Sequence, residues 1–286
     1  MQYEAPQTLD AASALLAGAG GVTRVLAGGT DLLIQMHGDF VNPDLVVDIK
    51  NIPEMRTIAV ENGRYRVGAA VTGMEIMEHE GFSTTWPGVV DGVGLIGSIQ
   101  IRGRATMGGN LCNASPAADS VPALVAAGAV ACISGPGGRR EVPVEEIATA
   151  PGKTSLAKGE IVASFLFPER GERSGGSYLR FTPRTEMDIA VVGAGVDLTL
   201  DEDGVCTRAK VALGAVAARI AVVEEAAAAL VGTKIDQAAL DALALAASAA
   251  CRPIDDKRGT VEFRTEVAGV LAKRAALKAA ERARQS

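Results

Sequence analysis

Two glycine pairs, far apart in the sequence, are the residues best suited to chemistry in this chain. The first lies in LAGGTDLL, residues 26–33, and the second in ATMGGN, residues 105–110. Each pair follows apolar or β-branched residues and precedes a segment that can begin a helix. Glycine lets the backbone turn tightly and bring bare N–H groups against an anion. Together the two loops predict a clamp around a diphosphate, as found in a dinucleotide such as FAD.

One such loop alone is ambiguous, because glycine pairs before a polar residue often only reverse the chain. The second loop adds weight, since residues 106–120, TMGGNLCNASPAADS, are dense in small and hydrogen-bonding side chains. Asp119 is expected early in a following helix, where a carboxylate can accept sugar hydroxyls. This segment can therefore surround a polar cofactor.

A different nucleotide site must also be weighed. Residues 92–97, GVGLIG, satisfy the GxGxxG pattern, and Asp119 follows at about the fingerprint distance. Residues 87–91 are too short and broken to be the buried first strand of a βαβ unit, so we interpret these glycines as permitting tight helix packing. The Rossmann site remains the less favoured alternative, and no GxxxxGK[ST] sequence exists for a P-loop.

The elements around the loops suggest two domains of mixed α and β structure. The boundary is predicted in PERGERSGG, residues 168–176, where apolar content collapses after an expected strand, and it divides the chain into domains 1–173 and 174–286. Strands followed by helices in the second part indicate an α+β fold. The basic residues between Lys273 and Arg284 are interpreted as a solvated helix face. Strands are predicted at 22–26, 45–49, 129–134, 161–167, 190–200 and 205–213, a hairpin at 58–67 around Asn62-Gly63, and helices at 8–17, 73–80, 88–98, 116–127, 224–250 and 260–284.

Composition narrows the function classes. The chain has 286 residues, 48% of them apolar, with a mean hydropathy of +0.21, which suffices for two packed cores. A net charge of −6 and 3% aromatic residues argue against nucleic acid. We expect no membrane span and a cytoplasmic location, since the amino terminus lacks a leader pattern. Four scattered cysteines and two histidines do not predict a metal site.

Four segments carry a resemblance to a known family: AGGTDLL, IRGRATMGGNLCNASPAADS, EIVASFLFP and YLRFTPRTEMDIAVV. They resemble the FAD-binding medium subunit of molybdenum hydroxylases, the group of xanthine dehydrogenase and carbon monoxide dehydrogenase, over nearly the whole chain. The resemblance implies a two-lobed FAD-binding domain of the p-cresol methylhydroxylase type. A small sheet-plus-helices domain of the carbon monoxide dehydrogenase flavoprotein C-terminal type follows it.

The resemblance also implies roles for individual residues. The two glycine loops would hold the FAD diphosphate mainly through backbone amides. Asp119 would take a hydroxyl of the cofactor, Val162 would pack beside the flavin or bond it through the main chain, and Arg180 would place a cation near the flavin ring. Ile96 stands where several relatives have a stacking aromatic residue, and Asp188 where carbon monoxide dehydrogenases tend to have tyrosine. The predicted cofactor-binding residues are Leu26, Ala27, Gly28, Gly29, Thr30, Asp31, Leu32, Leu33, Ile96, Thr106, Met107, Gly108, Gly109, Asn110, Asp119, Val162, Arg180 and Asp188.

By the same resemblance, FAD is held noncovalently and this chain relays electrons. A small subunit with [2Fe–2S] clusters would supply them, a large subunit with molybdopterin would oxidise the substrate, and an acceptor such as NAD or a quinone would receive them. The assembly would be a dimer of heterotrimers. Two alternatives remain: a self-contained FAD oxidoreductase acting directly on a small organic substrate, with Glu186 or Asp188 as a base, and a structural subunit that has lost its flavin.

Overall fold

The computed structural model describes residues 1–286, and its first lobe is a three-stranded parallel sheet with two helices. The outer strands β1 (Gln2–Glu4) and β2 (Thr23–Leu26) both pair with β3 (Leu45–Asp48). The Thr8 hydroxyl accepts a hydrogen bond from the N–H of Ala11 and caps α1 (Leu9–Gly18), as predicted. The short α2 (Leu32–His37) begins soon after β2, so the first glycine loop lies at the carboxyl edge of this sheet.

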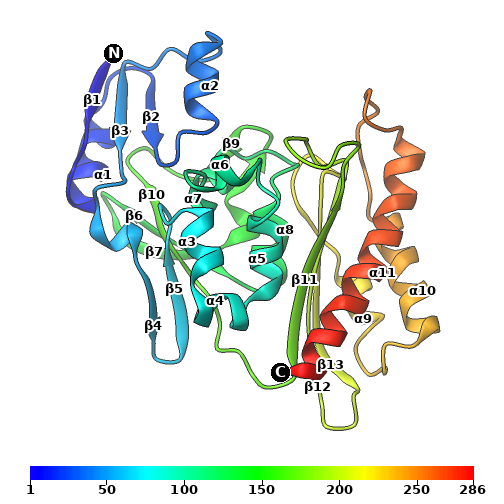
Figure 1. Cartoon of the computed structure of the whole chain (residues 1–286). Coiled ribbons are helices and arrows are strands. Elements are labelled where there is room, and N and C mark those ends of the chain that lie inside the picture. Colours follow the sequence, from blue (N-terminus) through cyan, green and yellow to red (C-terminus); the bar gives the residue numbers. More distant parts are fainter.

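The second lobe is built on a five-stranded sheet in the order β4-β5-β10-β6-β7 (Figure 1). The predicted hairpin is confirmed, because Asn62 and Gly63 have φ angles of 52° and 77°, the left-handed values that a tight two-residue turn requires. Its strands belong to the second lobe, since β5 pairs with β10. The strands are β4 (Ile58–Glu61), β5 (Arg64–Gly68), β6 (Val130–Gly135), β7 (Gly138–Pro143) and β10 (Ile161–Leu166), with a small separate pair β8 (Ala148–Ala150) and β9 (Lys153–Thr154).

Short helices fill the connection from β5 to β6. Two are shorter than predicted. The helix expected at 88–98 ends at Val93, and Gly97 then takes a φ of 56°. The helix expected from Pro116 begins at Ser120, because the Pro116 carbonyl instead accepts the N–H of Ala215. The helices of this lobe are η1 (Pro53–Arg56), α3 (Gly73–Glu78), α4 (Glu80–Thr85), α5 (Pro87–Val93), α6 (Ile99–Arg102), α7 (Met107–Cys112), α8 (Ser120–Ala126) and η2 (Val144–Glu146).

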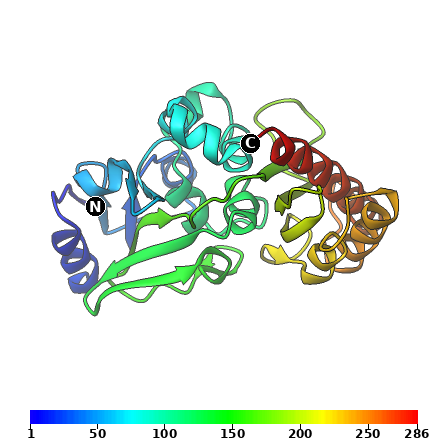
Figure 2. The same ribbon diagram turned by 90° about the horizontal axis from the view of Figure 1, so that it is seen from below.

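The carboxy-terminal part is an antiparallel sheet covered by helices on its outer face, visible from below in Figure 2. The longest helix packs so closely on the sheet that a Cβ added to Gly175 would lie 2.0 Å from the carbonyl oxygen of Ala279. The antiparallel strands come first in the sequence and the helices follow them, so the predicted α+β class is confirmed. The elements are β11 (Ser174–Phe181), β12 (Val192–Leu200), β13 (Cys206–Gly214), β14 (Ala221–Val222), α9 (Glu224–Ala228), α10 (Gln237–Ala249) and α11 (Val261–Gln285).

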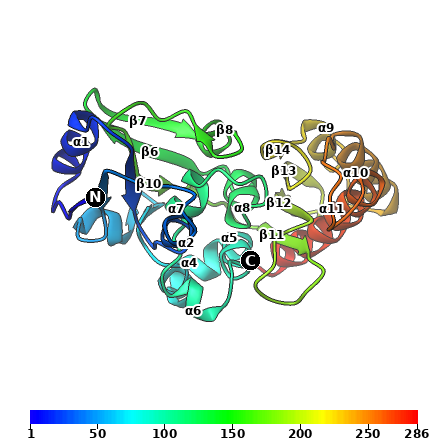
Figure 3. The same cartoon turned by 90° about the horizontal axis from the view of Figure 1, so that it is seen from above.

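The inner face of this sheet packs on α5 and α8 of the second lobe, as Figure 3 shows from above. A Cβ on Gly88 of α5 would lie 2.6 Å from the backbone nitrogen of Ser177. Asp91, also on α5, accepts hydrogen bonds from Lys278 and Arg282 of α11. The prediction that the basic residues of α11 form only a solvated face was thus wrong for these two, which join the domains.

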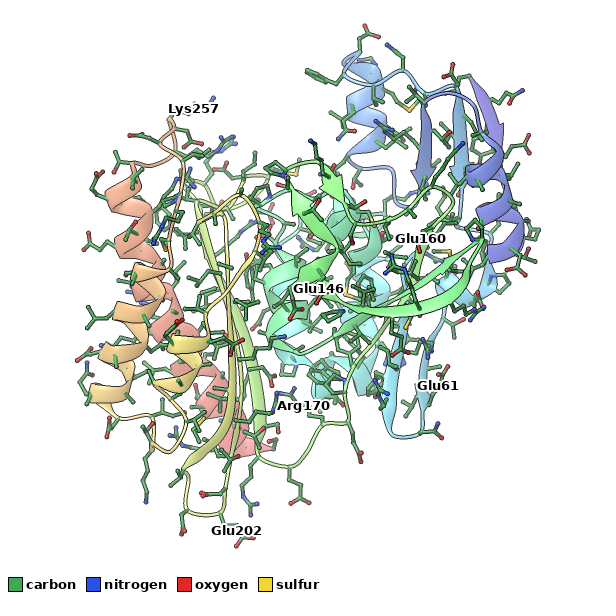
Figure 4. All side chains as sticks on the ribbon, turned by 180° about the vertical axis from the view of Figure 1, so that it is seen from behind. Glu61, Glu146, Glu160, Arg170, Glu202 and Lys257 are labelled. Carbon is green, nitrogen blue, oxygen red and sulfur yellow. The ribbon has the colours of Figure 1, made fainter.

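Two hydrophobic cores correspond to this organisation. One gathers side chains from Leu9 to Phe167, together with Ala212 and Ile220, and the other gathers side chains from Val191 to Ala283. Arg170 lies on the connection between them, and Glu202 marks the tip of the β12–β13 hairpin (Figure 4). No helix has both the length and the apolar content to cross a membrane.

Candidate functional site

The two glycine loops line one cavity, which lies between the two amino-terminal lobes. Its volume is about 440 Å³, within the size range of small-molecule and cofactor sites. The first loop reaches it from β2 and the second from the start of α7. The predicted residues that line it are Ala27, Gly28, Gly29, Thr30, Asp31, Leu32, Ile96, Thr106, Gly108, Gly109, Asn110 and Val162.

The loops touch at Gly28. A Cβ added there would lie 2.0 Å from the carbonyl oxygen of Arg104 and 3.0 Å from the Cα of Ala105, the residue before Thr106. No side chain fits in that space. Glycine at position 28 is therefore what allows the two loops to form adjacent walls of the same cavity.

The first loop offers unpaired donors to the cavity. None of the backbone N–H groups from Gly28 to Leu32 donates a hydrogen bond within the chain. Gly29 has a φ of 78°, a conformation that favours glycine and helps turn this backbone. Consecutive unpaired N–H groups are a good match for phosphate oxygens, which carry negative charge and accept several hydrogen bonds. The residues present therefore fit a diphosphate-containing cofactor.

The second loop contributes differently from the expectation. The Gly108 N–H donates to the Ala69 carbonyl at 3.2 Å, and the Gly109 N–H to the Thr106 hydroxyl at 2.9 Å, because Thr106 caps α7. These two amides are already paired within the chain. What glycine provides here is space: a Cβ on Gly109 would meet only the Thr106 hydroxyl oxygen, at 3.1 Å, and would otherwise face open cavity.

Side chains add polar groups to the same cavity. The Asn110 side-chain oxygen accepts hydrogen bonds from both the N–H and the hydroxyl of Ser120, at 3.2 and 2.7 Å. The Gln35 side-chain nitrogen donates to the Asn113 side-chain oxygen at 3.2 Å and so links α2 to the end of α7. The walls from the two lobes are thus joined by a side-chain bridge.

Other predicted residues lie outside the cavity lining. Leu26 ends β2 and packs under Gly29, Leu33 lies 54% exposed on α2, and Met107 is buried in the core. Asp188 lies in the loop between β11 and β12, where its carboxylate accepts hydrogen bonds from Arg184 and from the N–H of Ile189. The Arg184 guanidinium is the main cause that lowers the pKa of Asp188.

Asp119 and Arg180 meet each other across the domain interface. Arg180 on β11 donates to the Asp119 carboxylate, which also accepts the Tyr178 hydroxyl at 3.0 Å. All three side chains are largely buried. Burial raises the pKa of Asp119 to about 6, although Arg180 and Tyr178 both act to lower it. The resemblance implied that Asp119 and Arg180 bind the cofactor; neither is among the residues that line the cavity, and Asp119 directly precedes Ser120 in the chain.

Two titratable groups in the cavity wall are affected by their surroundings. Burial raises the pKa of Asp31, and burial also raises the pKa of the Cys112 thiol to about 12. A thiol with such a pKa stays protonated at neutral pH and is a poor nucleophile. The Cys112 environment therefore agrees with a cofactor held noncovalently.

Several lining residues were missed in the sequence. Cys112 and Asn113 stand within the second motif and could have been inferred from it. The others come from β2, from helix α2, from the residue before Thr106, and from strand ends and loops around β3, β5, β9 and β10. Most of them carry no local pattern, because only the packing of distant elements brings them to the cavity. These residues are Thr23, Arg24, Val25, Gln35, Ile49, Ala69, Ala105, Gly152, Thr154, Leu156, Glu160 and Ile161.

The GxGxxG run does not follow a strand. It spans the end of α5 and the turn after it, and a Cβ on Gly92 would lie 2.8 Å from the carbonyl oxygen of Asp119. The interpretation as a tight helix contact is confirmed for Gly92, which lets α5 approach the start of α8.

Comparison with known proteins agrees with this geometry. The family described as FAD binding domain in molybdopterin dehydrogenase matches residues 1–170, and the CO dehydrogenase flavoprotein C-terminal domain matches residues 177–279. The carbon monoxide dehydrogenase medium chain of Hydrogenophaga pseudoflava is 30% identical over 274 residues, covering 96% of this chain and 95% of that protein. A putative xanthine dehydrogenase FAD-binding subunit of Escherichia coli (strain K12) is 37% identical over 180 residues, 62% of each chain.

The fold of this chain also matches that of a relative of known structure. A solved structure of reconstituted CO dehydrogenase from Oligotropha carboxidovorans contains a chain that matches with a TM-score of 0.94 and 32% identity, over 99% of this chain and 98% of that one. The match extends through both domains, so it includes the cavity and the domain interface. The chain therefore belongs to the family of FAD-binding medium subunits of the molybdenum hydroxylases, which are oxidoreductases.

Proposed function

We propose that this chain is the FAD-carrying electron-transfer subunit of a molybdenum hydroxylase. It takes electrons from the [2Fe–2S] clusters of a small subunit and passes them to an external acceptor such as NAD or a quinone. A large subunit with molybdopterin oxidises the substrate. The relatives named above, medium chains and FAD-binding subunits of dehydrogenases, support this assignment.

The unpaired N–H groups from Gly28 to Leu32 are the observation that carries the proposal. Bound FAD supplies a carrier that accepts two electrons and can release them singly. The residues of the chain bind and orient it. The first loop holds the diphosphate through its amides, Gly109 leaves room beside it, and Ile96 and Val162 provide apolar walls that exclude water.

The same geometry favours a relay over a self-contained oxidoreductase that acts on an organic substrate. Such an enzyme needs a base beside the flavin. Of the two residues suggested for it, Asp188 directs its carboxylate to Arg184 and to the Ile189 N–H, and Glu186 is exposed in the same loop, outside the cavity. His79 is also engaged, because its ring nitrogen accepts the N–H of Phe82 and caps α4. None of these three side chains lines the cavity.

The test is to purify the chain alone and with the iron–sulfur and molybdopterin subunits encoded beside it. We expect FAD in both preparations, and bleaching of its visible absorption by the substrate of the assembly only in the complex. Reduction of the isolated chain by that substrate would support the self-contained alternative. A folded chain that takes up no FAD at saturating concentration would contradict the proposal.

A further inference from the structure

Ser120 contacts one side chain of the cavity wall, that of Asn110, without lining the cavity itself. It begins α8 and is fully buried, with 0% of its surface exposed. Its backbone N–H and its hydroxyl both point at the Asn110 side-chain oxygen, at 3.2 and 2.7 Å. A backbone N–H can only donate, so the Asn110 atom opposite must be the oxygen and not the nitrogen.

This fixes the direction of the Asn110 amide. Its NH₂ group must point the other way, and it makes no hydrogen bond within the chain, although Asn110 lines the cavity. Two donors are therefore presented to the cavity beside the unpaired amides of the first loop. Without the two bonds from Ser120, the Asn110 amide could turn over and present its oxygen, an acceptor, to the cavity in place of its NH₂.

Ser120 is itself held in place from the other domain. The preceding residue, Asp119, is bound by Arg180 and Tyr178 of β11. Asn110 thus reaches the cavity at the end of a chain of contacts that begins in the carboxy-terminal sheet. These contacts hold the residue at the start of α8.

We propose that Ser120 is a positioning residue of the FAD site, which orients the Asn110 amide so that its NH₂ donates to the cofactor. This inference depends on the proposed function, because it concerns the same cavity. It adds a residue that touches no cofactor and acts only through Asn110. Losing one hydrogen bond of about 1 kcal/mol corresponds to a change in affinity of roughly fivefold.

The test is a double-mutant cycle on FAD affinity, measured by titrating the full-length apo-protein and following flavin fluorescence. Ser120→Ala removes the hydroxyl, which makes the shorter of the two hydrogen bonds, and keeps the backbone N–H. We expect this loss to weaken FAD binding about fivefold in the wild type and not at all in the Asn110→Ala background. Ser177→Ala is the matched control, because Ser177 is also buried and its hydroxyl has no partner in the chain. It should leave the affinity unchanged. An equal loss from Ser120→Ala in both backgrounds, or no loss in either, overturns the proposal.

A second variant tests the direction of the amide without touching Ser120. Asn110→Asp keeps the acceptor that Ser120 needs and replaces the donor by a negatively charged oxygen facing the cavity. We expect about a 100-fold loss of FAD affinity with an unchanged melting temperature of the apo-protein. Wild-type affinity in Asn110→Asp would contradict the inference while leaving the FAD function intact. Failure of the wild-type chain to bind FAD would instead contradict the proposed function.

Discussion

Gly28 lies against Arg104 so closely that a Cβ at position 28 would sit 2.0 Å from the Arg104 carbonyl oxygen. These residues belong to two loops that lie far apart in the sequence, and their contact makes both loops walls of one cavity. The obstacle is backbone rather than a flexible side chain, so it cannot move away without shifting the second loop.

The first prediction concerns this contact. Gly28→Ala should destabilise the protein by about 2 kcal/mol, because it overpacks a backbone contact, and should weaken FAD binding at least about tenfold. Thermal unfolding and FAD titration measure the two effects. Gly20→Ala is the control, since a Cβ there meets no atom within 4 Å. Equal behaviour of the two variants would show that the loops do not depend on each other.

A substitution of Gly109 should also weaken FAD binding, but without destabilising the protein. Gly109→Val should keep or slightly raise the stability of the apo-protein, because valine has a better helix propensity than glycine and a Cβ there meets only Thr106, at 3.1 Å. The branched side chain would project into the cavity, and FAD affinity should fall by about 100-fold. The FAD affinity of Gly109→Ala should lie between those of the wild type and of Gly109→Val. Normal flavin content in the purified valine variant would refute the place given to the second loop.

The buried pair of Asp119 and Arg180 predicts a pH dependence of stability. The pKa of Asp119 is raised from 3.8 to about 6 in the folded chain, so between these pH values the folded state binds more protons than the unfolded state. Stability from this group is therefore largest at low pH and falls by about 3 kcal/mol as the pH rises from 4 to above 6.

Urea unfolding of the apo-protein at several pH values, compared with Asp119→Asn, isolates this contribution. The variant cannot ionise at this position, so the difference between the two unfolding free energies should change with pH across that window. A constant difference would mean that Asp119 does not titrate there.

Cys112 gives a prediction about how the flavin is held. Burial raises the pKa of its thiol to about 12, so it should not attack the cofactor. Acid precipitation of the holoprotein should leave the flavin in the supernatant as intact FAD, and Cys112→Ser should retain FAD at normal stoichiometry. Flavin that remains with the precipitated polypeptide would contradict noncovalent binding.

Local features were predictable from the sequence. The Thr8 cap and the Asn62-Gly63 turn depend on residues within a few positions of one another, and the structure has both where they were predicted. The two glycine loops could also be recognised from their residue types, because Gly29 has a left-handed backbone and Gly28 and Gly108 have no room for a Cβ. The long helix α11 followed from its periodicity.

Features that depend on distant partners were not predictable in the same way. Helix α8 starts late because the Pro116 carbonyl bonds to Ala215 in the other domain, and no pattern around Pro116 reveals that partner. Likewise, the amides of Gly108 and Gly109 are taken by Ala69 and Thr106. Asp119 and Arg180, expected at the cofactor, meet through the packing of β11 on α8, which only the domain interface determines.

The central claim is that both loops close on the diphosphate of one FAD molecule. A crystal structure of the chain grown with saturating FAD tests it most directly. We predict diphosphate oxygens within hydrogen-bonding distance of the backbone nitrogens from Gly28 to Leu32, with Gly109 beside them. FAD bound elsewhere, or no density for it between the two lobes, would contradict the account.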